Sequence, residues 1–346
     1  MRYRPLGRTG LTVSEYCLGA MMFGPMGNPD VDDCVRMVST ALDAGVNFID
    51  TADVYSHGES ERIVAKALRG RRDDVVLATK FFAPMPGDGD KRNRHGASRR
   101  WITQAVEDSL RRLETDYIDV YQQHRFDAAT DQQESLAALT DLVRAGKVRV
   151  IGSSSFAAER IVEAQWVSER AGLARYRTEQ PPYSLFRRGI ERAVLPTCRR
   201  YGMGTLIWSP LDGGWLSGRY RSEADFTQDA RLVRMASRWG GFDPTAEINR
   251  RKLGLVQAVT KLAEDAGLRL SHLATAFTVT HPDVTSAIIG PRTMEQLQDT
   301  LAGVDVRLDN DLLDALDALL PPGTDINQHD PSSDPAELAA TYRRGA

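Results

Sequence analysis

Residues 47–55 carry the first side chains whose types and spacing could do chemistry. They read Asn-Phe-Ile-Asp-Thr-Ala-Asp-Val-Tyr, so a short apolar strand ends by presenting Asp50 and Tyr55 five residues apart. Lys80 comes directly after the next predicted strand, and His124 comes just beyond the one after that. Each of these residues alone is commonly structural. Four ionisable types at the ends of consecutive strands favour a catalytic site instead.

The chemistry that these four groups support is proton transfer to a carbonyl oxygen. A tyrosine has a pKa near 10 in water, and a nearby ammonium such as that of Lys80 lowers it. Asp50 would keep Lys80 charged and oriented, and His124 would hydrogen-bond the same carbonyl oxygen. Tyr55 then acts as general acid while hydride reaches the carbon. Side chains carry no hydride, so this scheme requires a nicotinamide cofactor.

The elements that must position these residues form an alternating pattern. Eight apolar runs are the predicted strands: Tyr16–Gly19, Asn47–Asp50, Val75–Thr79, Tyr117–Tyr121, Val148–Gly152, Arg177–Gln180, Gly204–Trp208 and Thr285–Ile289. Eight strands alternating with helices predict a parallel sheet, and closure into a (β/α)8 barrel fits both the count and the usual length of about 250 residues plus insertions. An open doubly wound sheet is the alternative. Its dinucleotide motif, G-x-G-x-x-G, is absent.

The helices are predicted from apolar stripes at helical spacing. The stripes are Ile102, Val106, Leu110 and Leu113; Leu136, Leu139, Leu142 and Val143; a weaker one at Val162, Trp166 and Val167; and a final one at Leu312, Leu313, Leu316, Leu319 and Leu320. Ser98 is a predicted N-cap. Arg2–Val13 is expected to form a hairpin that plugs the barrel's bottom. Long loops are expected at Phe81–Gly96 and Ser209–Pro244, where function concentrates in barrels.

Residues 1–320 are therefore expected to form one barrel domain, and residues 321–346 a polar tail that is extended or mobile. With 42% hydrophobic and 26% charged residues, the composition is that of a globular protein. Net charge is −3 and arginine clusters lie among acids, so nucleic-acid binding is not expected. No signal pattern and no run of about 20 apolar residues is present, so neither export nor a membrane span is expected.

Cysteine and histidine usage points to a cytoplasmic protein without a metal. Cys17, Cys34 and Cys198 are far apart and odd in number, which favours a reducing compartment. The six histidines are dispersed and no H-E-x-x-H pair occurs, so no metal site is expected.

The motifs resemble those of a known family. Phe48–Tyr55, Thr79-Lys80 and His124 are similar to the signature segments of aldo-keto reductases, and the resemblance extends over nearly the whole chain. It is strongest to the bacterial reductases related to potassium-channel β subunits. The resemblance implies a catalytic tetrad of Asp50, Tyr55, Lys80 and His124.

The resemblance also implies a cofactor site along the other strand ends. Its residues are Gly19, Ala20 and Met21 beneath the nicotinamide; Ser154, Ser155 and Gln180 at the carboxamide; Trp208 stacked on the ring; a pyrophosphate loop with Ser209, Pro210, Leu211, Gly213, Gly214, Gly218 and Arg219; and Gly290, Arg292, Gln296 and Asp299 around the adenosine. Glycines allow close backbone approach to phosphate, and barrels often bind phosphate at loops seven and eight. Thr293 is expected to cap the helix that follows.

Arg292 is suited to bidentate phosphate binding, and the resemblance places it at a 2′-phosphate, so NADP(H) is expected rather than NAD(H). Two positions depart from the family pattern. Ser154-Ser155 stands where Ser-Asn is common, and Asp299-Thr300 where Glu-Asn is common.

The substrate side is less specific. Candidate pocket residues lie one or two positions beyond the tetrad and cofactor positions: Met22, Phe23, Phe81, Phe82, Arg125, Phe126 and Trp215. The loop Pro84–Gly96 is expected to close over them, and its charges with Arg125 leave room for a polar or anionic substrate.

The expected function is an NADPH-dependent reductase that converts an aldehyde or ketone to an alcohol, acting on a small-molecule carbonyl substrate. Two alternatives stay open: a cofactor-binding redox-sensing or scaffolding subunit with little turnover, and a barrel lyase or hydrolase that uses Asp50 and His124 without a cofactor. The sequence does not decide between a monomer and a homo-oligomer.

Overall fold

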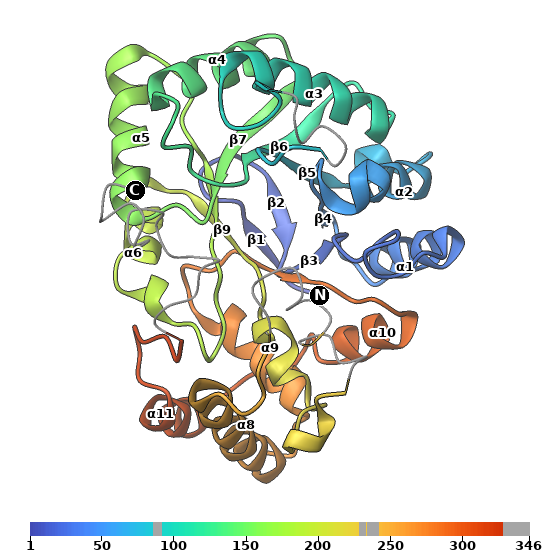
Figure 1. The fold of residues 1–346 in the computed structure, drawn as a ribbon, viewed down its shortest axis with the longest axis vertical. Helices are drawn as coiled ribbons and strands as arrows, with labels where there is room; N and C mark the ends of the chain where they lie inside the picture. The colour runs from blue at the N-terminus through green and yellow to red at the C-terminus, as the bar shows by residue number, and fades with distance from the viewer. Residues whose placement is uncertain (86–91, 228–232, 234–241, 328–346) are drawn as a thin grey trace.

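Eight parallel strands close into a barrel in the computed structural model of the chain, which describes residues 1–85, 92–227, 233 and 242–327 (Figure 1). The strands are β3 (Tyr16–Gly19), β4 (Phe48–Asp50), β5 (Val76–Phe81), β6 (Ile118–Gln123), β7 (Val148–Ser154), β8 (Thr178–Gln180), β9 (Gly204–Ile207) and β10 (Ser286–Ile289). They pair in chain order, and β10 pairs with β3 to close the ring. The predicted (β/α)8 barrel is confirmed.

Three strands run two residues further than the sequence predicts. β5, β6 and β7 continue to Phe81, Gln123 and Ser154, because their ladders stay in register to that point, with Phe81 opposite Gln123 and Gln123 opposite Ser153. Lys80 therefore lies within a strand rather than just beyond one. A side chain fixed in a ladder is held more rigidly than one on a loop.

Helices surround the barrel (Figure 1). They are α1 (Val31–Asp43), α2 (Glu59–Ala67), α3 (Arg99–Leu113), α4 (Gln132–Arg144), α5 (Ala158–Ala171), α6 (Val194–Tyr201), α8 (Glu247–Asp265), α9 (Leu270–Thr280), α10 (Met294–Ala302) and α11 (Asn310–Leu319). The predicted C-terminal helix is α11, which packs beside α8. Both predicted N-caps are confirmed: Ser98 accepts from the Trp101 N–H, and Thr293 from the Gln296 N–H. None of the described helices combines the length and apolar character needed to cross a bilayer.

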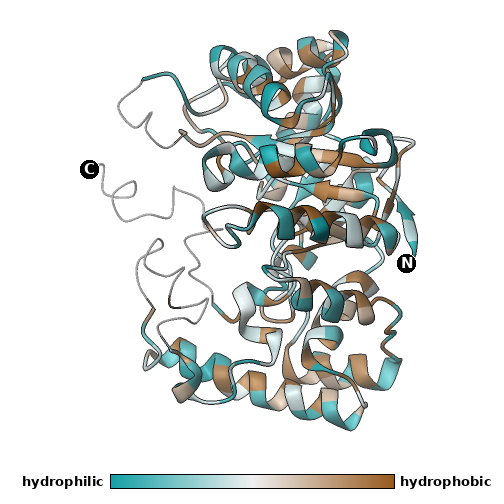
Figure 2. Ribbon diagram, turned by 90° about the vertical axis from the view of Figure 1, so that its right-hand side faces the viewer, coloured by the Kyte–Doolittle hydropathy of each residue, from teal (hydrophilic) through white to brown (hydrophobic). Residues whose placement is uncertain are grey.

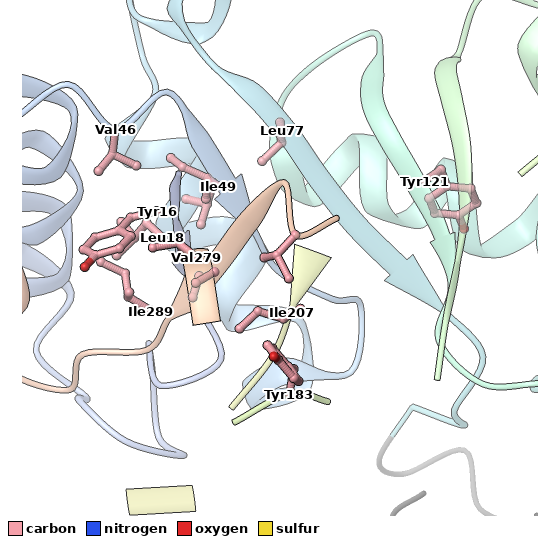
Figure 3. Packing of buried hydrophobic residues seen from close by; sticks show 14 of the residues in the cluster. Tyr16, Leu18, Val46, Ile49, Leu77, Tyr121, Tyr183, Ile207, Val279 and Ile289 are labelled. Carbon is pink, nitrogen blue, oxygen red and sulfur yellow. The ribbon is translucent and has the colours of Figure 1, made fainter. Parts of the chain in front are cut away.

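Strand alternation divides the apolar residues into two cores. Residues such as Leu18, Ile49, Leu77 and Ile207 belong to the large cluster between strands and helices (Figure 3). The helices carry brown faces toward it and teal faces away from it (Figure 2). The alternate positions belong to a second cluster inside the barrel: Cys17, Phe48, Ala78, Val120, Val150, Leu206 and Ile288.

The predicted N-terminal hairpin is also present. Strands β1 (Tyr3–Pro5) and β2 (Thr12–Ser14) pair antiparallel. Leu6 and Val13 are fully buried and belong to the interior cluster, so the hairpin closes the amino-terminal end of the barrel. With that end filled by apolar side chains, polar chemistry is confined to the carboxyl-terminal end.

The predicted apolar stripe of α5 is wrong at two of its three positions. Val162 and Trp166 are 41% and 58% exposed, whereas Val167 is buried. The face against the barrel is formed by Ile161, Ala164 and Val167 instead. The Trp166 ring lies outside, 4.8 Å from the Arg170 guanidinium, so a cation contact replaces core packing for this side chain.

The chain continues to pack on the barrel beyond residue 320. Ile326 is buried, and its N–H donates to the Phe186 carbonyl at 2.9 Å. The Thr324 carbonyl accepts from the Arg188 N–H at 3.0 Å. Residues 321–326, which the sequence predicts as tail, are thus part of the packed domain. Residues 328–346 of the predicted tail lie outside the described residues.

Candidate active site

A buried ion pair occupies the centre of the barrel's carboxyl-terminal end. Lys80 Nζ lies 2.5 Å from Asp50 Oδ2 and donates to the Thr51 carbonyl at 2.8 Å. Asp50 is the last residue of β4, and it aligns with Ala78, two residues before Lys80 on β5. Both side chains therefore point into the barrel, in successive layers above the apolar interior. The predicted contact between Asp50 and Lys80 is confirmed.

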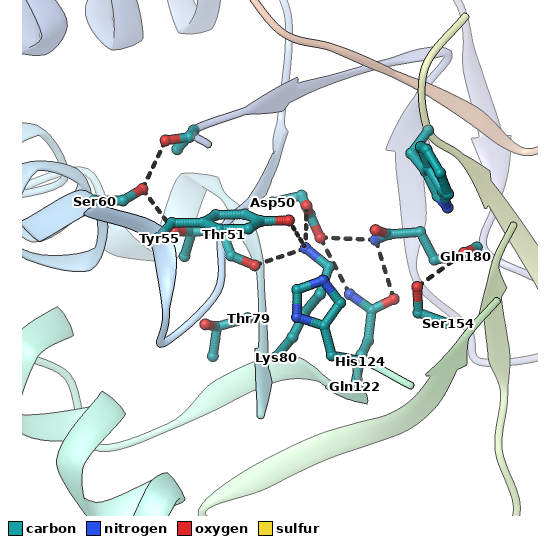
Figure 4. A network of polar contacts seen from close by, with 12 residues as sticks. Asp50, Thr51, Tyr55, Ser60, Thr79, Lys80, Gln122, His124, Ser154 and Gln180 are labelled. Atoms are coloured by element: carbon teal, nitrogen blue, oxygen red, sulfur yellow. Dashed lines mark hydrogen bonds and ion pairs between the residues drawn. The ribbon is translucent and has the colours of Figure 1, made fainter. Parts of the chain in front are cut away.

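Tyr55 reaches the same lysine from the loop after β4. Its hydroxyl lies 3.4 Å from Lys80 Nζ, and its side chain is half-buried (Figure 4). The next two residues, Ser56 and His57, have φ values of 48° and 61°, a left-handed turn that non-glycine residues adopt rarely. Ser56 Oγ donates to the Phe23 carbonyl at 2.7 Å and anchors this turn. The strained loop thus holds the phenol over the ammonium.

Burial and charge act in opposite directions on this pair. Burial raises the pKa of Tyr55 above its ordinary value, and the positive charge of Lys80 lowers it without cancelling that effect. Burial also acts to lower the pKa of Lys80, but the Asp50 carboxylate and Tyr55 outweigh it, so the pKa of Lys80 is raised. Lys80 therefore stays charged and Tyr55 stays a protonated phenol at neutral pH. The charge of Lys80 acts in the direction that the sequence predicts, but it does not bring the pKa of the phenol below its ordinary value.

His124 faces Tyr55 across the site. The two rings meet edge to face with centroids 5.8 Å apart. The backbone N–H of His124 donates to the Phe81 carbonyl at 3.0 Å, which fixes its position just beyond β6. Burial, then Lys80 and Arg125, hold the pKa of His124 well below its ordinary value. The imidazole is therefore neutral and retains one N–H to donate.

Gln122 belongs to the same network, although the sequence alone did not single it out. Its amide nitrogen donates to Asp50 Oδ1 at 3.1 Å, and the Gln180 amide donates to the same oxygen at 2.8 Å (Figure 4). Both oxygens of Asp50 are thus engaged, one by Lys80 and one by two amides. The signal for Gln122 was the alternation along β6, because Val120, Gln122 and His124 share one face.

The predicted carboxamide-binding residues lie together beside this network. Ser154 Oγ donates to the Gln180 carbonyl at 3.0 Å, and the two residues are opposite each other in the β7–β8 ladder. Because Asp50 and Gln122 take the Gln180 amide nitrogen, the amide oxygen is the group it retains for a ligand. Ser155 has φ +58° and accepts from the Trp208 indole N–H at 3.3 Å. Trp208 directly follows β9 and is only half-buried, so part of its ring is available for stacking.

The glycines of the predicted phosphate loop have the backbone geometry that requires them. Gly213, Gly214 and Gly218 have φ values of 70°, 115° and 81°. The Gly213 N–H donates to Ser209 Oγ at 2.8 Å. Pro210 is buried, Leu211 is half-buried and Arg219 is exposed. Beneath the loop, Asp212 pairs with Lys252 at 2.6 Å and is buried.

The loop after β10 presents a helix N-terminus and an arginine. The Arg292 N–H donates to Gln296 Oε1 at 2.8 Å, while Thr293 caps the same turn. No side chain among the described residues pairs with the Arg292 guanidinium. Gly290 is exposed. The Asp299 carboxylate, by contrast, is bonded by Arg269 and Ser271, so it faces the start of α9.

The segment at the end of β3 is hydrogen-bonded to β4. Gly19 pairs with Asp50 across the β3–β4 ladder, and a Cβ at this glycine would lie 2.6 Å from Ile288. The Ala20 N–H donates to the Asp50 carbonyl at 2.8 Å. Met21, the next residue, is half-buried. Gly19 therefore allows the end of β3 to pack closely against β10, while Ala20 holds it to β4.

The predicted substrate residues divide by burial. Met22, Phe23, Phe81 and Trp215 are at most 3% exposed and pack in the core, with Phe81 stacked on Tyr121 and Trp215 against Phe226. This burial favours packing over ligand contact for these four residues. Phe82, Arg125 and Phe126 are half-buried and stay candidates. Residues 86–91 of the loop predicted to close over them, and residues 228–232 and 234–241 of the second long loop, lie outside the described residues.

The arrangement can donate a proton to an oxygen placed near Tyr55 and His124. The charged Lys80 beneath the phenol would stabilise the developing phenolate, while the neutral imidazole holds the oxygen in place. No group in this constellation is a reductant, so a reduction at this site would take its electrons from a bound cofactor.

Comparisons with known proteins agree with this geometry. Residues 15–321 match the model of the aldo/keto reductase family. The uncharacterized oxidoreductase YrpG of Bacillus subtilis is 39% identical, with 93% of this chain and 96% of the relative covered. A probable voltage-gated potassium channel subunit beta of Oryza sativa subsp. japonica is 35% identical, covering 92% and 97%. The versiconal hemiacetal acetate reductase of Aspergillus parasiticus is 33% identical, covering 89% and 94%.

Proposed function

The chain belongs to the aldo/keto reductase family and is an oxidoreductase, and from this premise we propose that it reduces an aldehyde or ketone to an alcohol with NADPH. Tyr55 is the general acid. The observation that carries the proposal is the chain of contacts from Asp50 through Lys80 to the Tyr55 hydroxyl, with His124 on the far side of the phenol.

The side chains have separate roles in this reaction. Tyr55 gives its proton to the substrate oxygen, and Lys80 stabilises the phenolate that forms. Asp50 keeps Lys80 charged, and Gln122 fixes the Asp50 carboxylate. His124 hydrogen-bonds the carbonyl oxygen and orients it. These roles require a protonated Lys80 and a neutral His124. The raised pKa of Lys80 and the lowered pKa of His124 favour these states.

The residues on the barrel rim fit a dinucleotide. Gly213, Gly214 and Gly218 form a left-handed turn that can approach phosphate closely, and Arg292 stands at the amino end of α10 without a side-chain partner among the described residues. Trp208, Ser154 and Gln180 would hold the nicotinamide. When the cofactor is bound, its reduced nicotinamide supplies the hydride. Arg292 supports NADP(H) over NAD(H), because an extra phosphate would give its guanidinium an anionic partner.

Replacing Tyr55 with Phe tests the proposal. NADPH consumption with 4-nitrobenzaldehyde is expected to fall about 100- to 10,000-fold, the usual contribution of a general acid. Binding of NADPH, followed by fluorescence titration, should persist because the phenol ring is retained. Undiminished turnover would show that Tyr55 is not the acid.

A second candidate, a redox-sensing or scaffolding subunit, is favoured by the relative named as a potassium channel subunit beta. Multiple-turnover kinetics separate the two. A sensor would oxidise its bound cofactor once and slowly, whereas a reductase would cycle through many equivalents of NADPH and aldehyde. We expect cycling, in a reducing cytoplasmic setting that suits the three buried free cysteines.

A further inference from the structure

Arg125 is a cation at the mouth of the proposed active site, and no carboxylate of the described residues forms an ion pair with it. It is half-buried and directly follows His124. Its two hydrogen bonds both come from Nη1, to the His124 carbonyl at 3.0 Å and to Ser155 Oγ at 2.8 Å. Within the described part of the chain, no carboxylate lies at ion-pair distance from it. Partial burial of an unpaired charge is costly, and a ligand anion would offset that cost.

The surrounding contacts locate Arg125 between the acid and the ring-stacking residue. Its guanidinium carbon lies 5.9 Å from the centroid of the Trp208 ring, and both residues bond to Ser155. It is also close enough to Tyr55 for its charge to lower the phenol's pKa, although burial acts more strongly in the opposite direction. In the proposed reaction, the carbonyl oxygen of the substrate lies near Tyr55, and its carbonyl carbon faces the nicotinamide ring stacked on Trp208. A substrate in this position lies beside the Arg125 guanidinium.

Glu179 is near enough for its charge to act on Arg125, but among the described residues it forms no hydrogen bond or ion pair with the guanidinium. The carboxylate of Glu179 accepts from Ser153 Oγ and the Phe156 N–H, so its oxygens are already engaged. A second guanidinium, that of Arg187, lies 5.5 Å from the same Trp208 ring centroid. Burial is the main cause that lowers the pKa of Arg125; Tyr55 and the Glu179 carboxyl act to raise it, and the Arg187 charge acts to lower it further. Two guanidinium groups, those of Arg125 and Arg187, therefore lie near the Trp208 ring beside the proposed reacting centre.

We propose that Arg125 recognises an anionic group on the substrate, so that the preferred substrates are aldehydes or ketones bearing a carboxylate or phosphate. The inference rests on the proposed carbonyl reductase function and names its substrate class. Two of the guanidinium nitrogens, Nε and Nη2, make no bond within the described residues and present the edge that pairs with two oxygens of one anion. Lysine offers a point charge without this fork.

The test compares two aldehydes that differ only in charge: 4-carboxybenzaldehyde and its neutral methyl ester. The ratio of their kcat/KM values is measured with NADPH for the wild type and for Arg125→Met and Arg125→Lys. Because both aldehydes share one reacting centre, any general loss of activity cancels in the ratio. Arg149→Met, which removes an exposed arginine at the opposite end of the barrel, is the matched control.

The ratio is expected to favour the carboxylate in the wild type and to fall about 10- to 100-fold in Arg125→Met, as for a lost charge-assisted hydrogen bond. Arg125→Lys should fall in between, and the control should keep the wild-type ratio. Equal losses on both aldehydes would overturn the proposal. A raised KM for NADPH with an unchanged ratio would also overturn it, because Arg125 would then bind the cofactor and not the substrate.

If the wild type turns over neither aldehyde, the proposed function fails. A binding measurement then tests separately whether Arg125 recognises an anion. Calorimetry with the NADP⁺-loaded protein then compares the two aldehydes directly. Tighter binding of the carboxylate that is lost in Arg125→Met supports the site. Equal binding of both compounds overturns it.

Discussion

Asp50 and Lys80 form a buried ion pair, 2.5 Å apart, in which each partner has further hydrogen bonds of its own. Removing two charges from water is costly, and a buried pair is sustained only when its remaining donors and acceptors are satisfied. The Thr51 carbonyl accepts a hydrogen bond from Lys80, and the amides of Gln122 and Gln180 donate hydrogen bonds to Asp50. The site is therefore a network in which the loss of one member leaves the others unpaired.

Replacing Lys80 with Met is expected to lower the free energy of unfolding by about 3–5 kcal/mol, because it leaves the Asp50 charge buried without its counter-ion. Adding Asp50→Asn in the same chain should restore most of that stability, since neither charge is then present, while reductase activity stays absent. Urea unfolding of the two variants measures the difference. A Lys80→Met protein as stable as the wild type would contradict the account of the pair.

Gln122→Met removes one of the two amide donors to Asp50 Oδ1. Unfolding free energy should fall by about 1.5–3 kcal/mol, the usual range for a hydrogen bond to a charged group. We expect kcat to fall while the KM for NADPH changes little, because Gln122 acts on Asp50 and not on the cofactor. The control is Gln104→Met, which removes an exposed amide from α3. A change in the KM for NADPH alone would assign Gln122 to cofactor binding.

The barrel and the grouping of Asp50, Tyr55, Lys80 and His124 could be predicted from the sequence because their signals are local. Each strand shows its alternation within a few residues, and Phe48–Tyr55 is a contiguous motif. The contact between Gln122 and Asp50 joins positions 72 residues apart, so only the alternation on β6 pointed to it. The packing of Ile326 on Phe186 depends on a fold that brings distant segments together, and no local pattern reports it.

The sequence predicts the buried face of α5 wrongly and leaves the substrate-contacting residues undecided. Both outcomes have a related reason. Val162 and Trp166 have helical spacing, but the buried face of α5 is set by how the helix packs between its neighbours α4 and α6. Similarly, Trp215 and Phe23 follow predicted site positions in sequence, yet their neighbours in space are other apolar side chains. Apolar type alone does not distinguish a pocket wall from a core residue.

Gly152 is expected to tolerate no side chain. A Cβ there would lie 2.1 Å from Thr178 Oγ1 and 3.1 Å from Gln122 Cγ, so Gly152→Ala should destabilise the protein by about 1–3 kcal/mol through overpacking. Adding Thr178→Ala removes the clashing oxygen and should recover part of the loss. Gly254→Ala is the matched control, because a Cβ in this part of α8 meets nothing within 4 Å. Thermal unfolding compares the variants, and equal effects at both glycines would contradict the packing argument.

Glu179 makes the stability of the fold depend on pH. Burial raises the pKa of its carboxyl to about 7, so the folded state favours the protonated form. The resulting stabilisation is fully present below the ordinary pKa near 4.5 and is lost as pH rises through about 7. Between these limits the wild type should lose about 3 kcal/mol more stability than Glu179→Gln, which does not titrate. Urea unfolding at both pH values measures this, and parallel curves for the two proteins would refute it.

Arg292 and Arg219 offer a matched test of cofactor preference, because they are proposed to meet different phosphates. Arg292→Met should weaken NADPH binding about 10- to 100-fold, the cost of a lost charge-assisted hydrogen bond, and leave NADH binding nearly unchanged. Arg219→Met removes an exposed charge beside the proposed pyrophosphate loop and should weaken both cofactors by a similar, smaller factor. Fluorescence titration of each variant with each cofactor gives the four affinities. If Arg292→Met weakens NADPH and NADH equally, its guanidinium does not read the 2′-phosphate, and the preference for NADPH must come from elsewhere on the rim.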